Sequence, residues 1–173
     1  MTLRKNISDA LQGKNFFFSS RSKFKLFINE NIFISTLFFS GCFLVLDQII
    51  KKIAQNNNSD SFYLIKNIIG WEYFENYGIA FSLPMPKLLL ITLIPLIIVS
   101  LFIFLLKTKK KKFLFAFSVS LIIAGAISNL IDRVFFGFVI DYFRVFTSVI
   151  NIADIMIIVG GLILIVQGLK KKQ

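Results

Sequence analysis

Four long apolar stretches constrain this 173-residue chain more than any other feature. They cover about residues 32–54, 88–106, 113–134 and 152–169. Each approaches the ~20 residues that an α-helix needs to cross a lipid bilayer. Hydrophobic residues make up 56% of the chain, a share above that of ordinary soluble domains. The sequence therefore predicts an all-α membrane fold, a bundle of four transmembrane helices within residues 32–169.

The positive charges predict how this bundle is oriented. Six Lys or Arg residues lie in residues 1–31, five in the short link 107–112 and three at 170–172. Lys and Arg accumulate in cytoplasmic segments of membrane proteins. With four crossings these three segments share one side, so we expect both termini to be cytoplasmic, with basic tails at residues 1–31 and 170–173. Since topology accounts for the net charge of +11, we expect no nucleic-acid partner.

The segment between the first two apolar stretches, about residues 60–86, is more than a linker. It is rich in β-branched and aromatic residues, and Gly70, Gly78 and Pro84 supply turn signals. This pattern predicts a small extracytoplasmic β-structure that rests on the membrane. Its aromatic residues suit the membrane interface; they are Trp71, Tyr73, Phe74 and Tyr77.

The residue types that the chain lacks exclude several kinds of active site. The sequence contains no histidine and a single cysteine, Cys42. A Ser-His-Asp or Cys-His site and a zinc site of the H-E-x-x-H kind therefore cannot be built within it, nor can an intramolecular disulfide. We expect no metal and no other cofactor, so any hydrolysis must depend on Asp, Glu, Lys, Ser or Tyr.

Cys42 raises a separate possibility. The residues 39–42, which follow a basic segment, resemble the processing site of a lipoprotein, and the chain would then be a substrate. However, the sequence stays apolar after Cys42, whereas a cleaved signal gives way to polar residues. We interpret Cys42 as a helix-packing residue.

Most of the acidic residues lie at or near the predicted outer side. An ionisable residue in a membrane span is costly and is a candidate for function. These seven of the nine acids are Asp47, Asp60, Glu72, Glu75, Asp132, Asp141 and Asp154. Their distribution predicts chemistry at the outer face of the membrane.

Two groups of polar residues fall within the helices. Asp47 and Lys51 are four residues apart and share a helix face, so we expect an ion pair that locks the end of the first helix, with a secondary role in binding substrate. On the third helix one polar stripe must face the bundle interior; it consists of Gly125, Asn129, Asp132 and Arg133. Gly125 permits close helix approach, and the rest fit a polar scaffold and a direct catalytic role equally well.

Asp141 and Asp154 form the candidate catalytic pair. Asp141 follows the third helix, and Asp154 begins the fourth, where Asn151 could cap the helix and the helix dipole favours an acid. Two carboxylates held close keep one proton between them over a useful pH range. The ionised one can take a proton from water while the protonated one donates to a carbonyl, which suffices to hydrolyse an amide.

These motifs resemble the lipoprotein signal peptidase family, also called signal peptidase II. The resemblance covers most of the chain after residue ~40, in four blocks that keep the order of the family. The blocks are Asp47-Gln48-Ile49-Ile50-Lys51, Asn76-Tyr77-Gly78-Ile79-Ala80-Phe81-Ser82, Gly125-Ala126-Ile127-Ser128-Asn129-Leu130-Ile131-Asp132-Arg133, and Val139-Ile140-Asp141-Tyr142-Phe143 with Asn151-Ile152-Ala153-Asp154. Ile150 departs from the phenylalanine that is usual before the last block.

The resemblance implies an aspartic endopeptidase of the bacterial inner membrane. Such an enzyme removes the signal peptide from a diacylglyceryl-modified prolipoprotein, cutting before the lipidated cysteine, so its partners are that substrate and membrane lipid. By the same resemblance the dyad is Asp141 and Asp154, and Asp132 belongs to the scaffold. The residues expected to bind substrate or support the site are Asp47, Lys51, Asn76, Gly78, Asn129, Asp132, Arg133 and Asn151.

Two other classes of protein are alternatives to a peptidase. A small transporter or channel subunit could use Asp47, Asp132 and Asp154 as a proton relay, but relay carboxylates lie near the midplane and often in internal repeats. Here the acids gather at one edge, and no repeat is visible. A purely structural membrane protein gives no reason for that gathering. Ion flux across proteoliposomes separates the transporter from the peptidase.

Overall fold

The computed structural model describes residues 31–65, 68–79, 85–108 and 113–170. The predicted basic tail at residues 1–31, apart from Asn31, lies outside the described residues. Lysines 109–112 and residues 171–173 also lie outside them. The helices and strands below therefore belong to the described part of the chain.

Four helices within the described residues match the four apolar stretches. They are α2 (Ile32–Asn56), α3 (Lys87–Lys107), α4 (Phe113–Phe135) and α5 (Ile152–Lys170). All four are long and apolar enough to cross a membrane. The prediction of four membrane-spanning helices is confirmed, with Pro95 inside α3.

A small antiparallel sheet accompanies the helices. Its strands are β1 (Phe62–Ile65), β2 (Ile69–Asn76), β3 (Val139–Val145) and β4 (Ser148–Ile150), in the order β1-β2-β3-β4. The first two strands lie in the segment at about residues 60–86 where the sequence predicted a small β-structure. The sequence missed β3 and β4, which the short segment between α4 and α5 contributes, because that segment shows no alternation long enough to separate a strand from a loop.

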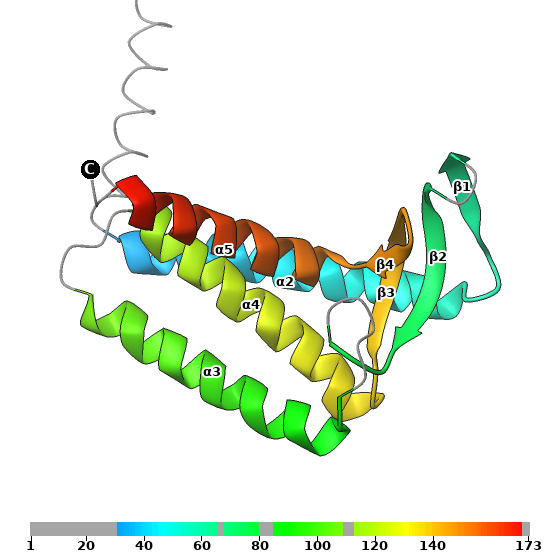
Figure 1. Ribbon diagram of the computed structural model, residues 1–173, viewed down its shortest axis with the longest axis horizontal. Helices are drawn as coiled ribbons and strands as arrows, with labels where there is room; N and C mark the ends of the chain where they lie inside the picture. The colour runs from blue at the N-terminus through cyan, green and yellow to red at the C-terminus, as the bar shows by residue number, and fades with distance from the viewer. Residues whose placement is uncertain (1–30, 66–67, 80–84, 109–112, 171–173) are drawn as a thin grey trace, which may run out of the picture.

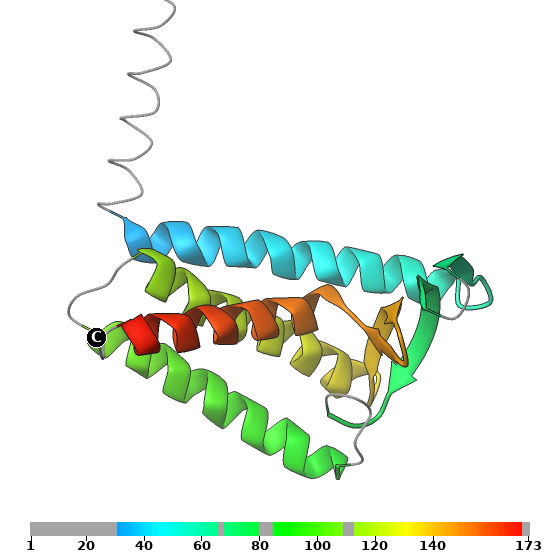
Figure 2. The same cartoon turned by 45° about the horizontal axis from the view of Figure 1, so that its top comes forward.

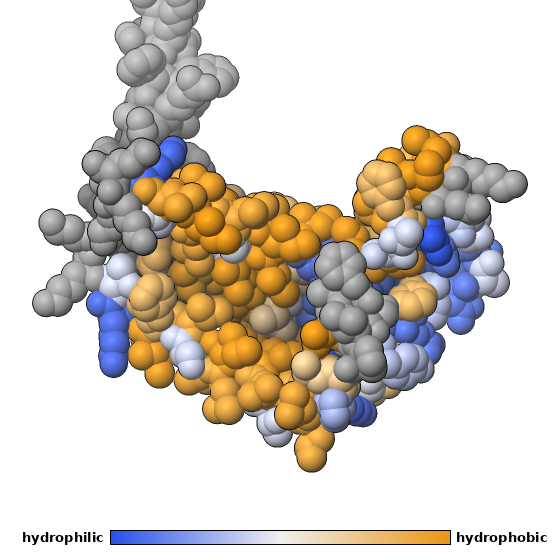
Figure 3. All heavy atoms as spheres, viewed as in Figure 1, coloured by the Kyte–Doolittle hydropathy of each residue, from blue (hydrophilic) through white to orange (hydrophobic). Residues whose placement is uncertain are grey.

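The sheet lies at one end of the helical bundle (Figures 1 and 2). The opposite end gathers the start of α2, the end of α3, the start of α4 and the end of α5. This grouping is the one that the positive charges predict for segments on a single side of the membrane. On the face that Figure 3 shows, hydrophobic residues cover the helices, while hydrophilic residues gather near the sheet. Figure 3 also shows hydrophilic residues at the opposite end, so the bundle presents lipid-compatible flanks between two ends that carry polar residues.

Helix α4 is the central helix of the bundle. In the most apolar 18 residues of α4, 56% are buried inside the protein, whereas at most 22% of the corresponding residues are buried in each of the other three helices. A Cβ atom added at Gly125 would lie 2.6 Å from the carbonyl oxygen of Ala153, and one at Gly160 would lie 2.7 Å from that of Ser118. Small residues allow membrane helices to approach this closely. The predicted role of Gly125 is confirmed, and Gly160 acts in the same way from α5.

Cys42 does not pack between helices. Its side chain is exposed at the surface of α2, so the interpretation of Cys42 as a packing residue is wrong. A surface position on a membrane-spanning helix faces lipid, where a small apolar thiol is well tolerated.

The two adjacent glycines of α5 provide a test of this packing. Gly160→Ala should destabilise the protein by about 1–3 kcal/mol, because the added methyl group overpacks the contact with α4. Gly161→Ala is the matched control, since a Cβ atom there meets nothing within 4 Å and alanine favours a helix. Thermal unfolding in detergent measures both. Equal midpoints for the two variants would contradict this account of the α4–α5 contact.

Candidate functional site

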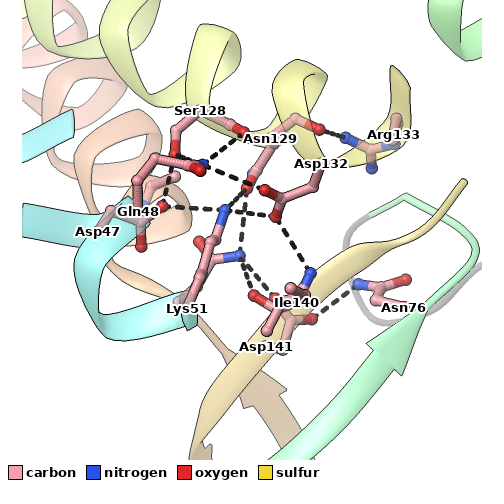
Figure 4. A network of polar contacts seen from close by, with 12 residues as sticks. Asp47, Gln48, Lys51, Asn76, Ser128, Asn129, Asp132, Arg133, Ile140 and Asp141 are labelled. Atoms are coloured by element: carbon pink, nitrogen blue, oxygen red, sulfur yellow. Dashed lines mark hydrogen bonds and ion pairs between the residues drawn. The ribbon is translucent and has the colours of Figure 1, made fainter. Parts of the chain in front are cut away.

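A buried cluster of charges lies beneath the sheet. The Lys51 ammonium is 2.9 Å from Asp47 Oδ2 and 2.8 Å from Asp132 Oδ2, and it donates to Asn129 Oδ1 at 2.9 Å (Figure 4). Lys51 is 1% exposed, and both carboxylates are fully buried. The predicted pair of Asp47 and Lys51 is confirmed, and Asp132 of α4 joins it. Lys51 therefore holds α2 against α4.

Asp132 connects this cluster to the sheet. Its Oδ2 accepts from the backbone N–H of Ile140 on β3 at 3.1 Å, and its Oδ1 accepts from Gln48 Nε2 at 3.1 Å. Oδ1 thus contacts α2, and Oδ2 contacts both α2 and the strand that follows α4. These contacts favour the scaffold role that the sequence suggested for Asp132.

Asp47 contacts three further elements. It accepts from Ser128 Oγ at 2.6 Å, from the Tyr142 hydroxyl at 2.9 Å and from the Ala153 N–H at 3.3 Å. These donors belong to α4, β3 and α5. Because protein groups surround both of its oxygens, Asp47 serves mainly to join the four elements around the site.

Asp154 lies in the first turn of α5, where it forms a reciprocal cap with Asn151. Asn151 Oδ1 accepts from the Asp154 N–H at 2.8 Å, and Asp154 Oδ2 accepts from the Asn151 N–H at 3.4 Å. This is the capping-box arrangement of a helix start, so the predicted cap is confirmed. Asp154 Oδ1 also accepts from Asn129 Nδ2 at 2.8 Å. The cap uses Oδ2 of Asp154, whereas Oδ1 of the same acid contacts the buried polar cluster through Asn129.

Asp141 lies on β3, one of the two inner strands of the sheet, and not on a loop. Its Oδ1 accepts from Asn151 Nδ2 at 2.6 Å, and its Oδ2 accepts from Asn76 Nδ2 at 3.0 Å. Each amide is oriented by a second bond, since Asn151 Oδ1 is taken by Asp154 and Asn76 Oδ1 accepts from the Gly78 N–H. One residue, Asn151, therefore contacts both candidate catalytic acids, as the sequence could not foresee.

The two carboxyl groups differ in their electrostatic surroundings. Burial, reinforced by the negative charge of Asp154, raises the pKa of Asp141 to about 7, although Asn76, Lys51 and Asn151 oppose the shift. Asp154 instead lies at the positive end of a helix dipole, which favours a carboxylate. Asn129 also links it to the Lys51 ammonium. The burial of Asp141 therefore favours a proton on this acid.

Arg133 and Gly78 connect the site to the segment after β2. The Arg133 guanidinium donates to the Gly78 carbonyl at 2.9 Å and to the Asn129 carbonyl at 3.2 Å. Gly78 is thus held by Arg133 and Asn76 from two sides. Residues 80–82 of the same block lie outside the described residues.

All ten residues that the sequence selected lie in this one connected network. Three further members were missed: Gln48, Ser128 and Tyr142. Ser128 lies on the polar stripe of α4, three residues after Gly125, and could have been found by that spacing. The Tyr142 hydroxyl gave no signal in the sequence. Within the described residues, no three His, Cys, Asp or Glu side chains come together in a group that could hold a metal ion.

The family model and the curated relatives agree on one family. The family model described as "Signal peptidase (SPase) II" matches residues 39–170. The lipoprotein signal peptidase of Halothermothrix orenii is 37% identical over 126 residues, covering 70% of this chain and 86% of the relative. That of Clostridioides difficile is 36% identical over 129 residues, covering 72% and 87%. A solved bacterial membrane enzyme superposes with a TM-score of 0.75 at 27% identity, covering 82% of this chain and 92% of that one.

Two neighbouring lysines test the buried cluster. Lys51→Met should destabilise the protein by about 3–5 kcal/mol, because two buried carboxylates lose their shared counterion. Lys52→Met is the control, since Lys52 is exposed, and its unfolding midpoint should stay close to that of the wild type. Thermal unfolding in one detergent compares them. A Lys51→Met protein as stable as Lys52→Met would mean that the cluster does not hold the bundle together.

Proposed function

The chain belongs to the signal peptidase II family of aspartic peptidases, and from this premise we propose that Asp141 and Asp154 are its catalytic dyad. It is a lipoprotein signal peptidase with four candidate membrane spans. The observation that carries the proposal is the bridging by Asn151, whose side chain contacts Asp141 and caps the turn that holds Asp154. Asp141 is buried and Asp154 is partly buried, and two carboxyl groups held close can share a proton.

We infer the roles of the two acids in hydrolysis from their different surroundings. Asp154, as the carboxylate, takes a proton from water while the water oxygen attacks the scissile carbonyl carbon. Asp141 gives its proton to the carbonyl oxygen, so that a neutral tetrahedral diol forms. Asp154 then passes its proton to the leaving amine. As the C–N bond breaks, one diol hydroxyl returns a proton to Asp141, which restores the starting state of the dyad.

The other residues of the network hold the dyad in place. Asn129 orients Asp154, Asn76 orients Asp141 and Asn151 orients both. Asp47, Lys51 and Asp132 form the scaffold beneath them. Arg133 holds Gly78 beside the site, and we propose that the backbone following Gly78 contacts the substrate chain.

The substrate that we propose is a diacylglyceryl-modified prolipoprotein, cut before its lipidated cysteine. The dyad lies where the helices meet the sheet, since Asp141 is on β3 and Asp154 is in the first turn of α5. A signal helix and the lipid chains can stay in the bilayer while the scissile bond reaches this level. The described helix ends that adjoin the basic segments lie at the opposite end of the bundle. With those segments cytoplasmic, we propose that the site faces the extracytoplasmic side of the bacterial inner membrane.

Replacing either acid tests the dyad. Asp141→Asn and Asp154→Asn should each lower kcat by about 100-fold or more, because each removes one partner of the proton transfer. The assay is cleavage of a diacylglyceryl-modified prolipoprotein by purified protein in detergent, followed as a gel shift. Asp60→Asn, at an exposed acid, is the control. Retained cleavage in a folded dyad variant would remove that acid from the mechanism. Inactive wild-type protein with ion flux in proteoliposomes would favour the transporter instead.

The pH dependence of cleavage tests the assignment of the proton. The raised pKa of Asp141, about 7, means that this acid is protonated below that pH and ionised above it. Therefore kcat/KM should fall about tenfold per pH unit above pH 7, as the dyad loses its shared proton. Folding across the range is checked by thermal unfolding. Activity that stays level to pH 9 would contradict the role of Asp141 as the acid.

A further inference from the structure

Tyr142 is a buried polar residue that the proposed reaction leaves unused. It follows Asp141 on β3 and is 4% exposed. Its ring lies 5.3 Å from that of Trp71, between ring centroids. Successive side chains of a strand point to opposite faces, so Tyr142 points away from the face that carries Asp141. Its hydroxyl donates to Asp47 Oδ1 at 2.9 Å and accepts from the Ile152 N–H at 3.0 Å.

The second of these bonds reaches the start of the helix that carries Asp154. The first N–H groups of an α-helix have no partner within the helix. In α5 the N–H of Ile152 donates a hydrogen bond to the Tyr142 hydroxyl. The N–H of Ala153 donates to Asp47, and the N–H of Asp154 donates to Asn151. Three side chains from separate parts of the chain thus hold the first three N–H groups. The first turn of α5 is fixed from outside the helix as well as by its own cap.

We propose that Tyr142 is a positioning residue, whose hydroxyl sets where Asp154 lies relative to Asp141. The inference rests on the proposed dyad. Asp141 and Tyr142 are neighbours on one strand, so a bond from Tyr142 to the N-terminus of α5 links the two acids across the sheet–helix boundary. Asn151 makes the same link on the side of the carboxyl groups. Tyr142 and Asn151 together attach the strand to the first turn of α5 at two points. Two attachments prevent the rotation of the helix turn that a single attachment would allow.

The state of the Tyr142 hydroxyl supports this role. Burial, together with the negative charge of Asp47, raises the pKa of Tyr142. The hydroxyl therefore keeps its proton and remains a donor to Asp47 while it accepts from Ile152. Asp47 is in turn paired with Lys51, so the hydroxyl connects the buried charge cluster to the dyad.

The test is Tyr142→Phe, which keeps the ring and removes only the hydroxyl. We expect kcat to fall about 10-fold or more, since small displacements of catalytic groups are costly, while KM stays within about twofold. The upper limb of the pH profile should move to lower pH, because a loosened Asp154 raises the pKa of Asp141 less. Tyr73→Phe is the matched control: Tyr73 packs in the same apolar cluster, but its hydroxyl bonds to Glu75.

The outcomes separate this inference from the dyad itself. A Tyr142→Phe enzyme with lower thermal stability but the kcat and pH profile of the wild type would show a structural hydroxyl only and overturn the proposal. If Tyr142→Phe does not fold, difluorotyrosine at position 142 decides, since it keeps the ring and weakens the hydroxyl as an acceptor; an unchanged kcat and pH limb overturn the proposal. Full activity in Asp141→Asn or Asp154→Asn would instead refute the dyad.

Discussion

An ammonium group buried between two carboxylates, inside a bundle with little water, is the interaction on which the rest of this structure depends. Lys51 is paired with Asp47 and Asp132, and each of these three residues would be costly to bury alone. Their remaining hydrogen-bonding capacity is taken up by α4, by the N–H of β3 and by the first turn of α5. The need to satisfy buried charge therefore dictates how α2, α4, α5 and the sheet meet.

The candidate dyad lies directly above this cluster and is connected to it by amide side chains. Asn129 contacts Lys51 and Asp154, and Asn151 contacts Asn129 and Asp141. Amides suit this position because each offers a donor and an acceptor without adding charge. They connect the ion cluster to the two acids that we propose as the catalytic dyad. The buried ion cluster and the two candidate catalytic acids thus belong to one hydrogen-bonded network.

Much of this arrangement could be predicted from residues alone, although unevenly. The helices were predictable because apolar length is a direct requirement of the bilayer. The pair of Asp47 and Lys51 and the polar stripe of α4 were predictable because helix periodicity places those residues on one face. The strands β3 and β4 were not predictable. Strand β4 has only three residues and exists as a strand only through its pairing with β3. Cys42 was misjudged because apolar sequence does not distinguish a lipid-facing position from a packed one.

The sequence by itself determined that the fold belongs in a lipid bilayer and that four helices are long enough to span it. It also determined which residue types are available for chemistry and, through its motifs, the family. These properties are local, since they depend on composition and on spacing within one helix. Only the tertiary structure decided that Asp132 shares Lys51 with Asp47, that Asn151 touches both acids and that Tyr142 reaches the start of α5. The pair of Lys51 and Asp132 joins residues that are far apart in the chain, and the bond from Tyr142 joins a strand side chain to the backbone N–H of Ile152. The packing of α2, α4 and α5 around buried charge brings these groups within hydrogen-bonding distance.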